Sequence, residues 1–328
     1  MFGVLLLAAA IGLLLWLASS VLLLAFAAIL FSVFLDGAAF GVSRWLHLRR
    51  AWALALAIVT LGSLVGGFAW GVAPRISDQA DVLITRLPQA VRSVAAELRQ
   101  YDWGRWVLGQ VELAGREAVL QRVSGWVSTL LWVVSSLVLT IIVGIYLAAE
   151  AARYKRGTLI LVPGRHRDTA AKLMAGAAHT MRWWLVGQMV AMGFTGVTTF
   201  VGLRALEVPL ALTLSVLTAV LTFVPNIGAI VSAVPPALLA LQDGFFSMLS
   251  VVALYVVLQT TEGYFVTPMA QRRAVHLPPA LLLLTQVLMG VLFGLLGVIL
   301  AAPLTAVAVT WTHMLYIDPV FSASASGH

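Results

Sequence analysis

The sequence predicts an all-α membrane protein that crosses the bilayer several times, and three observations support this. Of the 328 residues, 61% are hydrophobic and 10% are charged, whereas soluble domains carry about 25% charge. The mean hydropathy is +1.01. The apolar residues form continuous runs rather than alternating segments of about ten residues, which excludes a transmembrane β-barrel. We expect about six full transmembrane helices plus two broken, re-entrant helical hairpins arranged as an inverted repeat.

Residues 1–150 are predicted to form a scaffold of membrane helices. The run 1–35 carries no charge and is too long for one span, so it predicts two closely linked helices, the first retained rather than cleaved. A basic loop at 36–50 follows. In chain order the predicted scaffold helices are 2–18, 20–35, 51–73 and 127–149.

Within this scaffold, residues 74–125 differ in character. They contain seven Arg and six acidic residues, and their apolar residues recur at helical spacing. This pattern predicts a water-exposed amphipathic helical segment rather than a span.

The second half of the chain is predicted to begin with a basic linker helix at 151–185. The stretch 150–185 has seven basic residues against Glu150 and Asp168, and Glu150 is expected to pair with Arg153. A transport region, 186–313, and a tail, 314–328, follow. The elements predicted in the transport region are a helix at 186–203, a hairpin at 209–241, a helix at 245–266 and a hairpin at 278–313.

The first hairpin is predicted from a run that is apolar but interrupted. A continuous helix over 209–241 would reach roughly 50 Å, well beyond the ~30 Å hydrocarbon core. Pro225 removes a backbone donor and disfavours helix before it, and Gly228 permits a sharp turn. The second long run, 278–313, has Gly290, Gly294 and Gly297 in its middle, with Pro303 after them. Both runs follow a helix and a proline, which predicts an internal repeat.

The distribution of charge sets the expected orientation. The loops at 36–50, 150–185 and 267–279 are basic and are expected in the cytoplasm, whereas the nearly neutral 74–125 segment is expected outside. The two hairpins then enter from opposite sides of the membrane. Such inverted repeats support alternating access.

Polar residues within the apolar runs are the candidate site residues. Asn226, the one asparagine of the chain, lies at the first hairpin tip beside the start of a helix arm. It would cap that helix locally, or help present free N–H groups to a polar solute. Glu262 would bind a proton, a cation or a substrate donor, or else meet water or Arg272 at the interface. The candidate substrate-binding residues are Pro225, Asn226, Gly228, Gln188, Gln259 and Gln286, with packing between helices as the alternative for Gln188 and Gln286. The candidate hinge or packing residues are Pro235, Pro236, Gly290, Gly294, Gly297 and Pro303.

Several function classes lack support in the sequence. There are no cysteines, and the histidines are scattered, so neither a thiolate site nor a metal site is predicted. No HExxH, GxSxG or Walker A motif occurs, so we expect no enzyme activity, no cofactor and no built-in ATPase. The net charge of +7 is explained by membrane topology rather than by nucleic-acid binding.

The stretch VPNIGAIVSAVPPALLAL resembles the signature of the autoinducer-2 exporter family, also called PerM-like permeases. The pattern is a proline, a glycine three residues later, a small apolar run and a further proline. The likeness covers nearly the whole chain. Its matching positions here are Pro225, Gly228, Pro235, Pro236, Gly187, Gln188, Glu262, Gly263, Pro268, Leu277, Pro278, Pro279, Gly294, Gly297 and Pro303, with Pro74, Gln79, Leu87, Pro88 and the 146–150 helix end in the first half. Tyr264 and Thr267 depart from the Asn and Glu that the family often has there.

The resemblance implies a bacterial inner-membrane exporter in contact with membrane lipid and assembled as a homo-oligomer, such as a pentameric ring. Some members resemble transporters of autoinducer-2, a small polyol, and others look like sodium–proton antiporters. We therefore expect a secondary exporter of a small polar organic solute. A cation–proton antiporter using Glu262 is the first alternative, and a non-transporting membrane scaffold is the second.

Overall fold

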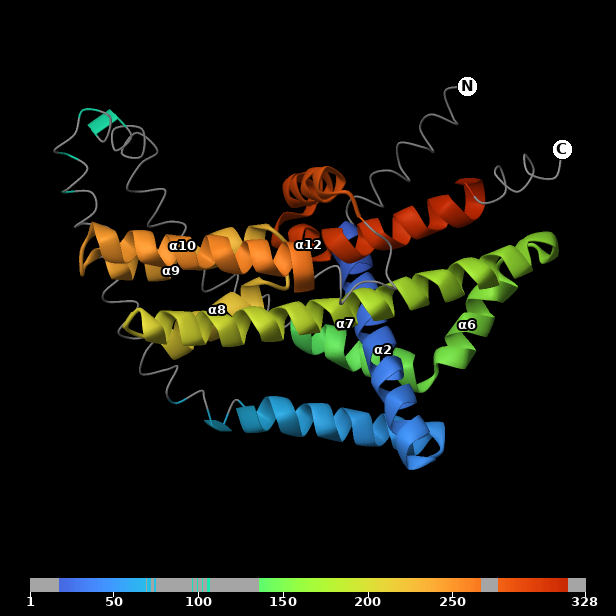
Figure 1. Cartoon of the computed structure of the whole chain (residues 1–328). Coiled ribbons are helices and arrows are strands. Elements are labelled where there is room, and N and C mark those ends of the chain that lie inside the picture. The colour runs from blue at the N-terminus through green and yellow to red at the C-terminus, as the bar shows by residue number, and fades with distance from the viewer. Residues whose placement is uncertain are drawn as a thin grey trace, which may run out of the picture. The chain divides into compact units, whose positions relative to one another are not determined.

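All regular secondary structure in the described residues is helical, as the sequence predicts (Figure 1). The computed structural model describes residues 18–68, 136–266 and 277–317, together with 70–71, 74, 96, 99, 102 and 105–106. Five helices in these residues are long and apolar enough to cross a membrane, or six if one bent pair is a single span. The chain is therefore a multi-pass membrane protein of helical class.

Some sequence predictions fall outside the described residues. They are the helix at 2–18, nearly all of the 74–125 segment, Arg272 with most of the 267–279 loop, and the tail beyond 317. These remain predictions.

The chain divides into two compact units. The first holds 1–61, 136–186 and 271–328, and the second holds 62–135 and 187–270. The helix α7, Arg167–Ala205, contributes residues to both. The predicted division into a scaffold and a transport region concerns motion and stays a prediction.

The N-terminal core of the first unit is built from small residues. It joins α2 (Ser19–Leu46) to the helix Arg50–Phe68 and to the helix Ser136–Ala149. Its buried members are Leu35, Ala39, Ala53, Leu54, Ala57 and Ala148. Alanine keeps the helix backbones close, which favours packing where lipid gives no hydrophobic drive between helices.

Helix α2 is longer than the sequence analysis expected. The predicted helix ended at residue 35, but α2 continues to Leu46, so the loop shrinks to residues 47–49. Asp36, which the sequence predicts to lie just beyond the helix, is inside it and pairs with Arg50 and Arg182. These ion pairs with residues outside α2 stabilise the charged Asp36 within the helix.

The basic stretch also differs from the expectation. It folds into α6 (Ala151–Ile160), a short turn of helix at Gly164–His166 and the first half of α7, so the helix expected to begin at 186 begins at Arg167. The helices Ser136–Ala149 and α6 are bent by 83° at Glu150. The expected Glu150–Arg153 ion pair is confirmed, with 3.2 Å between Oε2 and Nη1.

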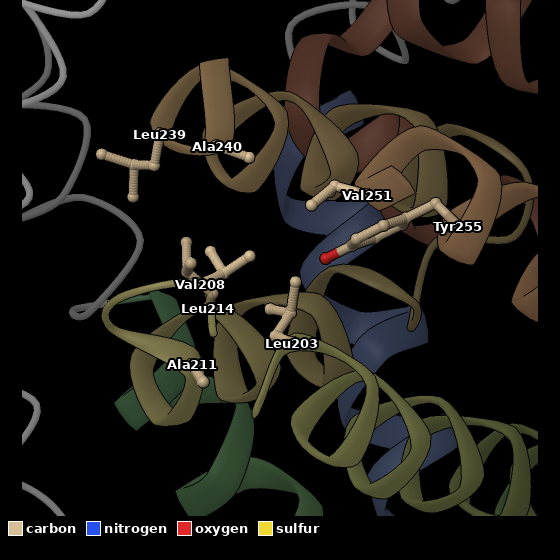
Figure 2. Close-up of a cluster of buried hydrophobic side chains, with 8 residues drawn as sticks. All are labelled: Leu203, Val208, Ala211, Leu214, Leu239, Ala240, Val251 and Tyr255. Carbon is tan, nitrogen blue, oxygen red and sulfur yellow. The ribbon is translucent and has the colours of Figure 1, made fainter. Parts of the chain in front are cut away.

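The second unit is built around the first hairpin, and its predicted break is confirmed. Helix α8 (Ala211–Leu221) and helix α9 (Ile227–Leu241) form the two arms. They pack with α7 and with α10 (Phe245–Thr261). Figure 2 shows the buried apolar cluster that these four helices share: Leu203, Val208, Ala211, Leu214, Leu239, Ala240, Val251 and Tyr255.

This apolar cluster lies at one end of the unit. It takes the start of α8 and the end of α9, so the hairpin tip lies at the other end. Gln188 and Leu203 are 15 residues apart on α7, or about 22 Å along a helix. The tip end is the polar end, as described below.

The second hairpin belongs to the first unit. Helix α12, Pro279–Thr312, is interrupted at Gly294, where φ is 62° and ψ is −147°. Its two arms meet, since the Thr305 hydroxyl donates to the Thr285 hydroxyl oxygen at 3.0 Å. The predicted break among the three glycines is therefore confirmed.

Candidate functional site

The tip of the first hairpin is a tight turn centred on Asn226. Its φ is 64° and its ψ is −58°, and the Ile227 N–H donates to the Pro225 carbonyl oxygen at 2.7 Å. This is a γ-turn with positive φ, a rare and strained conformation. Asparagine tolerates positive φ better than most residues with a side chain. The Asn226 side chain makes no capping hydrogen bond to α9, so the local cap considered in the sequence analysis is not formed.

Gly228 allows the two arms to approach at backbone distance. A Cβ atom added there would collide with the carbonyl oxygen of Leu221, at the end of α8. The Gly228 N–H donates to the Val224 carbonyl oxygen at 2.9 Å. Position 228 therefore accepts only glycine without opening the hairpin, because the colliding atoms belong to the main chain.

Gln188 of α7 supports this turn from beside it. Its side chain is 3% exposed, and Nε2 donates to the Thr222 carbonyl oxygen at 2.5 Å. Thr222 follows the last residue of α8, where helix carbonyls lack partners within the helix. The Gln188 amide donates a hydrogen bond to one of these carbonyl oxygens. Lipid tails have no hydrogen-bond donor and could not replace it.

Glu262, at the end of α10, faces α7 about two helical turns from this support. Its side chain is 8% exposed, and the Thr195 hydroxyl donates to Oε2 at 3.5 Å. Thr195 is seven residues from Gln188, or roughly 10 Å along the helix. Glu262 opens a π-helical turn, Glu262–Val266, a feature frequent at functional sites. The alternative partner, Arg272, lies outside the described residues, so an interfacial role for Glu262 stays a prediction.

The interior between Glu262 and the apolar cluster is polar as well. The hydroxyls of Thr218 and Tyr255 share a hydrogen bond of 2.8 Å. Thr199 is fully buried on α7, one turn beyond Thr195. The buried polar residues of this unit are Gln188, Thr195, Thr199, Thr213, Ser215, Thr218, Thr222, Ser232 and Glu262. Water-filled or protein-lined polar regions at membrane depth are where transporters keep their sites.

Sequence reasoning missed part of this arrangement. It singled out Gln188 and Glu262 but not Thr195, Thr218 or Tyr255. Residues 188, 195 and 199 are spaced seven and four apart, which puts them on one face of a helix. That spacing was a usable signal for Thr195, whereas nothing in the sequence could pair Thr218 with Tyr255.

The remaining candidates are distributed over both units. Gln259 is half-buried on α10, one turn before Glu262. Pro235 and Pro236 lie inside α9, and Pro236 is buried. Gln286 is fully buried on α12, which belongs to the first unit, whereas Gln188 belongs to the second. Pro303 is also buried there, in the second arm of α12.

The three glycines of α12 have distinct surroundings. Gly294 supplies the break itself. A Cβ at Gly297 would collide with the Met289 carbonyl oxygen, and one at Gly290 would come 2.8 Å from Val298 Cγ2. Among the described residues no group of three or more His, Asp or Glu side chains could hold a metal ion.

Comparison with known proteins finds similarity to one family of transporters and to several proteins named as transport proteins. The profile of the AI-2E family transporters matches residues 5–317. The chain is 24% identical over 253 residues to "Putative transport protein YueF" of Bacillus subtilis (strain 168), covering 72% of this chain and 69% of that protein. It is 30% identical to "Putative transport protein YhhT" of Escherichia coli (strain K12), covering 48% and 44%. It is 29% identical to "AI-2 transport protein TqsA" of the same organism, covering 44% of each chain. The matched segments thus span less than half of both E. coli proteins.

Proposed function

The chain belongs to the AI-2E transporter family, and we propose on that basis that it is a secondary exporter of a small polar organic solute. One relative is named an AI-2 transport protein, which supports a solute like autoinducer-2. The protein acts in the bacterial inner membrane. It works by alternating access, with an elevator-like movement of 186–313 against the other helices.

The observation that carries the proposal is the polar end of the second unit. A strained turn, a buried glutamine and a buried carboxylate lie between the hairpin tip and the middle of this membrane unit. A polar group in lipid is costly, so an apolar helix retains one only where it has a partner or a role. The cluster at the opposite end is apolar except for Tyr255, whose hydroxyl is already bonded to Thr218.

The tip binds the solute through the following groups. The Asn226 amide offers donors and an acceptor, and its lack of a local cap leaves it available. The N-terminus of α9 adds a partial positive charge, although the N–H groups of Ile227 and Gly228 already donate to Pro225 and Val224. Gln188 acts as a positioning residue, because its amide is committed to the Thr222 carbonyl.

The test uses Asn226→Gly. Glycine adopts positive φ without strain, so the turn is kept while the amide is lost. We expect export to fall by about tenfold, the cost of losing one or two hydrogen bonds. Thermal stability should be unchanged or slightly raised. The measurement is uptake of a small polyol panel, including autoinducer-2, into inverted vesicles.

Gln242→Gly is the matched control for this substitution. Gln242 also carries a side-chain amide, but it is exposed and lies at the far end of α9. Its replacement by glycine should leave uptake unchanged. If the Asn226→Gly variant takes up the solute as fast as the wild type, the Asn226 amide does not contribute to solute binding.

A cation–proton antiporter is the second candidate, and the burial of Glu262 favours it. An antiporter would exchange sodium for protons in vesicles without any organic solute. An exporter would move the solute, with a gradient of protons or sodium only as its energy source. Exchange in the absence of every solute of the panel would put the antiporter first.

Assembly as a homo-oligomeric ring, such as a pentamer, belongs to the same proposal. It rests on the family resemblance. The mass of the detergent-solubilised protein, measured by light scattering with the detergent contribution subtracted, tests it. A monomer at all concentrations would contradict it.

A further inference from the structure

The turn that joins α2 to the helix Arg50–Phe68 lies at a membrane surface. It consists of residues 47–49 alone, and His47 makes the turn with φ 54° and ψ 30°. Both flanking helices are long and apolar enough to cross the bilayer. A connection this short between two spans has no room to leave the interface, so its side chains sit at headgroup depth.

This turn carries an excess of positive charge. Asp36 is shared by two guanidiniums, with Oδ1 2.8 Å from Arg50 Nη2 and Oδ2 3.2 Å from Arg182 Nη2. Arg44 and Arg49 are exposed and make no ion pair within the described part of the chain. The turn and its surroundings thus hold four arginines against one carboxylate.

Two tryptophans flank these arginines. The side chain of Trp45 is 87% exposed and that of Trp52 is 69% exposed. Indole rings are enriched where a membrane meets water, because one edge is apolar and the N–H remains hydrated. The turn therefore combines membrane-depth aromatics with two guanidiniums, those of Arg44 and Arg49, that no carboxylate of the described residues neutralises.

We propose that this turn binds the phosphate headgroup of an anionic phospholipid. The guanidiniums of Arg44 and Arg49 match the geometry of phosphate oxygens, and Arg50 and Arg182 add positive potential. Trp45 and Trp52 lie against the glycerol and upper acyl region. Charge complementarity and interfacial depth together select a lipid rather than a soluble partner.

The test compares lipid binding by native mass spectrometry of the full-length protein in detergent. Phosphatidylglycerol and phosphatidylcholine are titrated separately. The wild type should bind phosphatidylglycerol preferentially. Arg44→Gln/Arg49→Gln should weaken this binding roughly thirtyfold, since each basic residue near an anionic lipid contributes about fivefold in affinity. A rise of about tenfold in ionic strength should weaken the wild-type preference, because the contact is exposed to solvent.

The matched control removes two positive charges elsewhere. Arg165 and Lys172 lie near the start of α7, are exposed, and make no ion pair in the described residues. Arg165→Gln/Lys172→Gln should retain the preference. Equal loss in both double variants would overturn the site in favour of a diffuse charge effect. Equal affinity for the two lipids, or competition by inorganic phosphate at the same concentration, would also overturn it.

Discussion

Asn226 and Glu262 each occupy a state that costs free energy, and both lie at the same end of the second unit. The first has a backbone conformation that few residues with a side chain adopt, and the second is a carboxylate buried in a membrane helix. Strained backbone and buried charge persist where the surrounding structure enforces them. Here the surrounding structure includes two hydrogen bonds from α7: Gln188 donates to the carbonyl of Thr222 near the turn, and Thr195 donates to Glu262.

Glu262→Gln tests the role of the buried carboxylate. Glutamine keeps the size and the contact with Thr195 but cannot ionise. We expect transport to slow a few-fold with part of its pH or sodium dependence retained, because the hydrogen-bond partner of this carboxylate is the Thr195 hydroxyl rather than a second acid. The measurement is vesicle transport with and without imposed gradients.

Glu150→Gln is the control for that substitution. Glu150 forms an exposed pair with Arg153, and such pairs contribute about 0–1 kcal/mol. It should leave both rate and gradient dependence unchanged. Complete loss of sodium–proton exchange in an assembled Glu262→Gln protein would favour the antiporter.

At the scale of elements, the two arms approach each other in the same way in both hairpins. In each, a glycine of the second arm lies against a carbonyl of the first, Gly228 against Leu221 and Gly297 against Met289. Each lies only a few residues beyond its turn, so the arms meet directly after they reverse. The correspondence is local, and the inverted repeat remains a prediction.

Gly228→Ala should therefore destabilise the second unit. The added methyl group meets main-chain atoms, which cannot rotate away, so a cost of about 1–3 kcal/mol is expected. Gly193→Ala, on an open face of α7, is the matched control. It should stabilise by up to about 1 kcal/mol through helix propensity. Thermal unfolding in detergent measures both, and equal melting temperatures would contradict the close approach.

At the scale of the whole molecule, the charge asymmetry predicts the topology. Seven basic residues occur in 150–185, whereas 74–125 is nearly neutral, and basic loops stay in the cytoplasm. Single cysteines at Ser93 and Thr169 can report this, because the chain has none of its own. An impermeant thiol reagent on whole cells should label position 93 and spare position 169. Labelling of 169 alone would reverse the orientation.

The amino-acid sequence by itself was enough to predict the membrane class, the break at Pro225–Gly228, a second break among Gly290, Gly294 and Gly297, and the family. These follow from composition and from the local effects of proline and glycine, which do not need a partner segment. The length of α2 could not be predicted in this way. The helix passes through Asp36 because Arg182, far along the chain, neutralises it.

The candidate site shows the same division. Gln188, Asn226 and Glu262 were recognisable as polar residues in apolar runs, but their partners were not. Only the tertiary structure decided that Gln188 binds the carbonyl of Thr222, that Thr195 faces Glu262, and that Gln286 lies in the other unit. Polarity is a property of a single residue, whereas a hydrogen bond between distant helices depends on how those helices pack, and packing is set by contacts that no local pattern encodes.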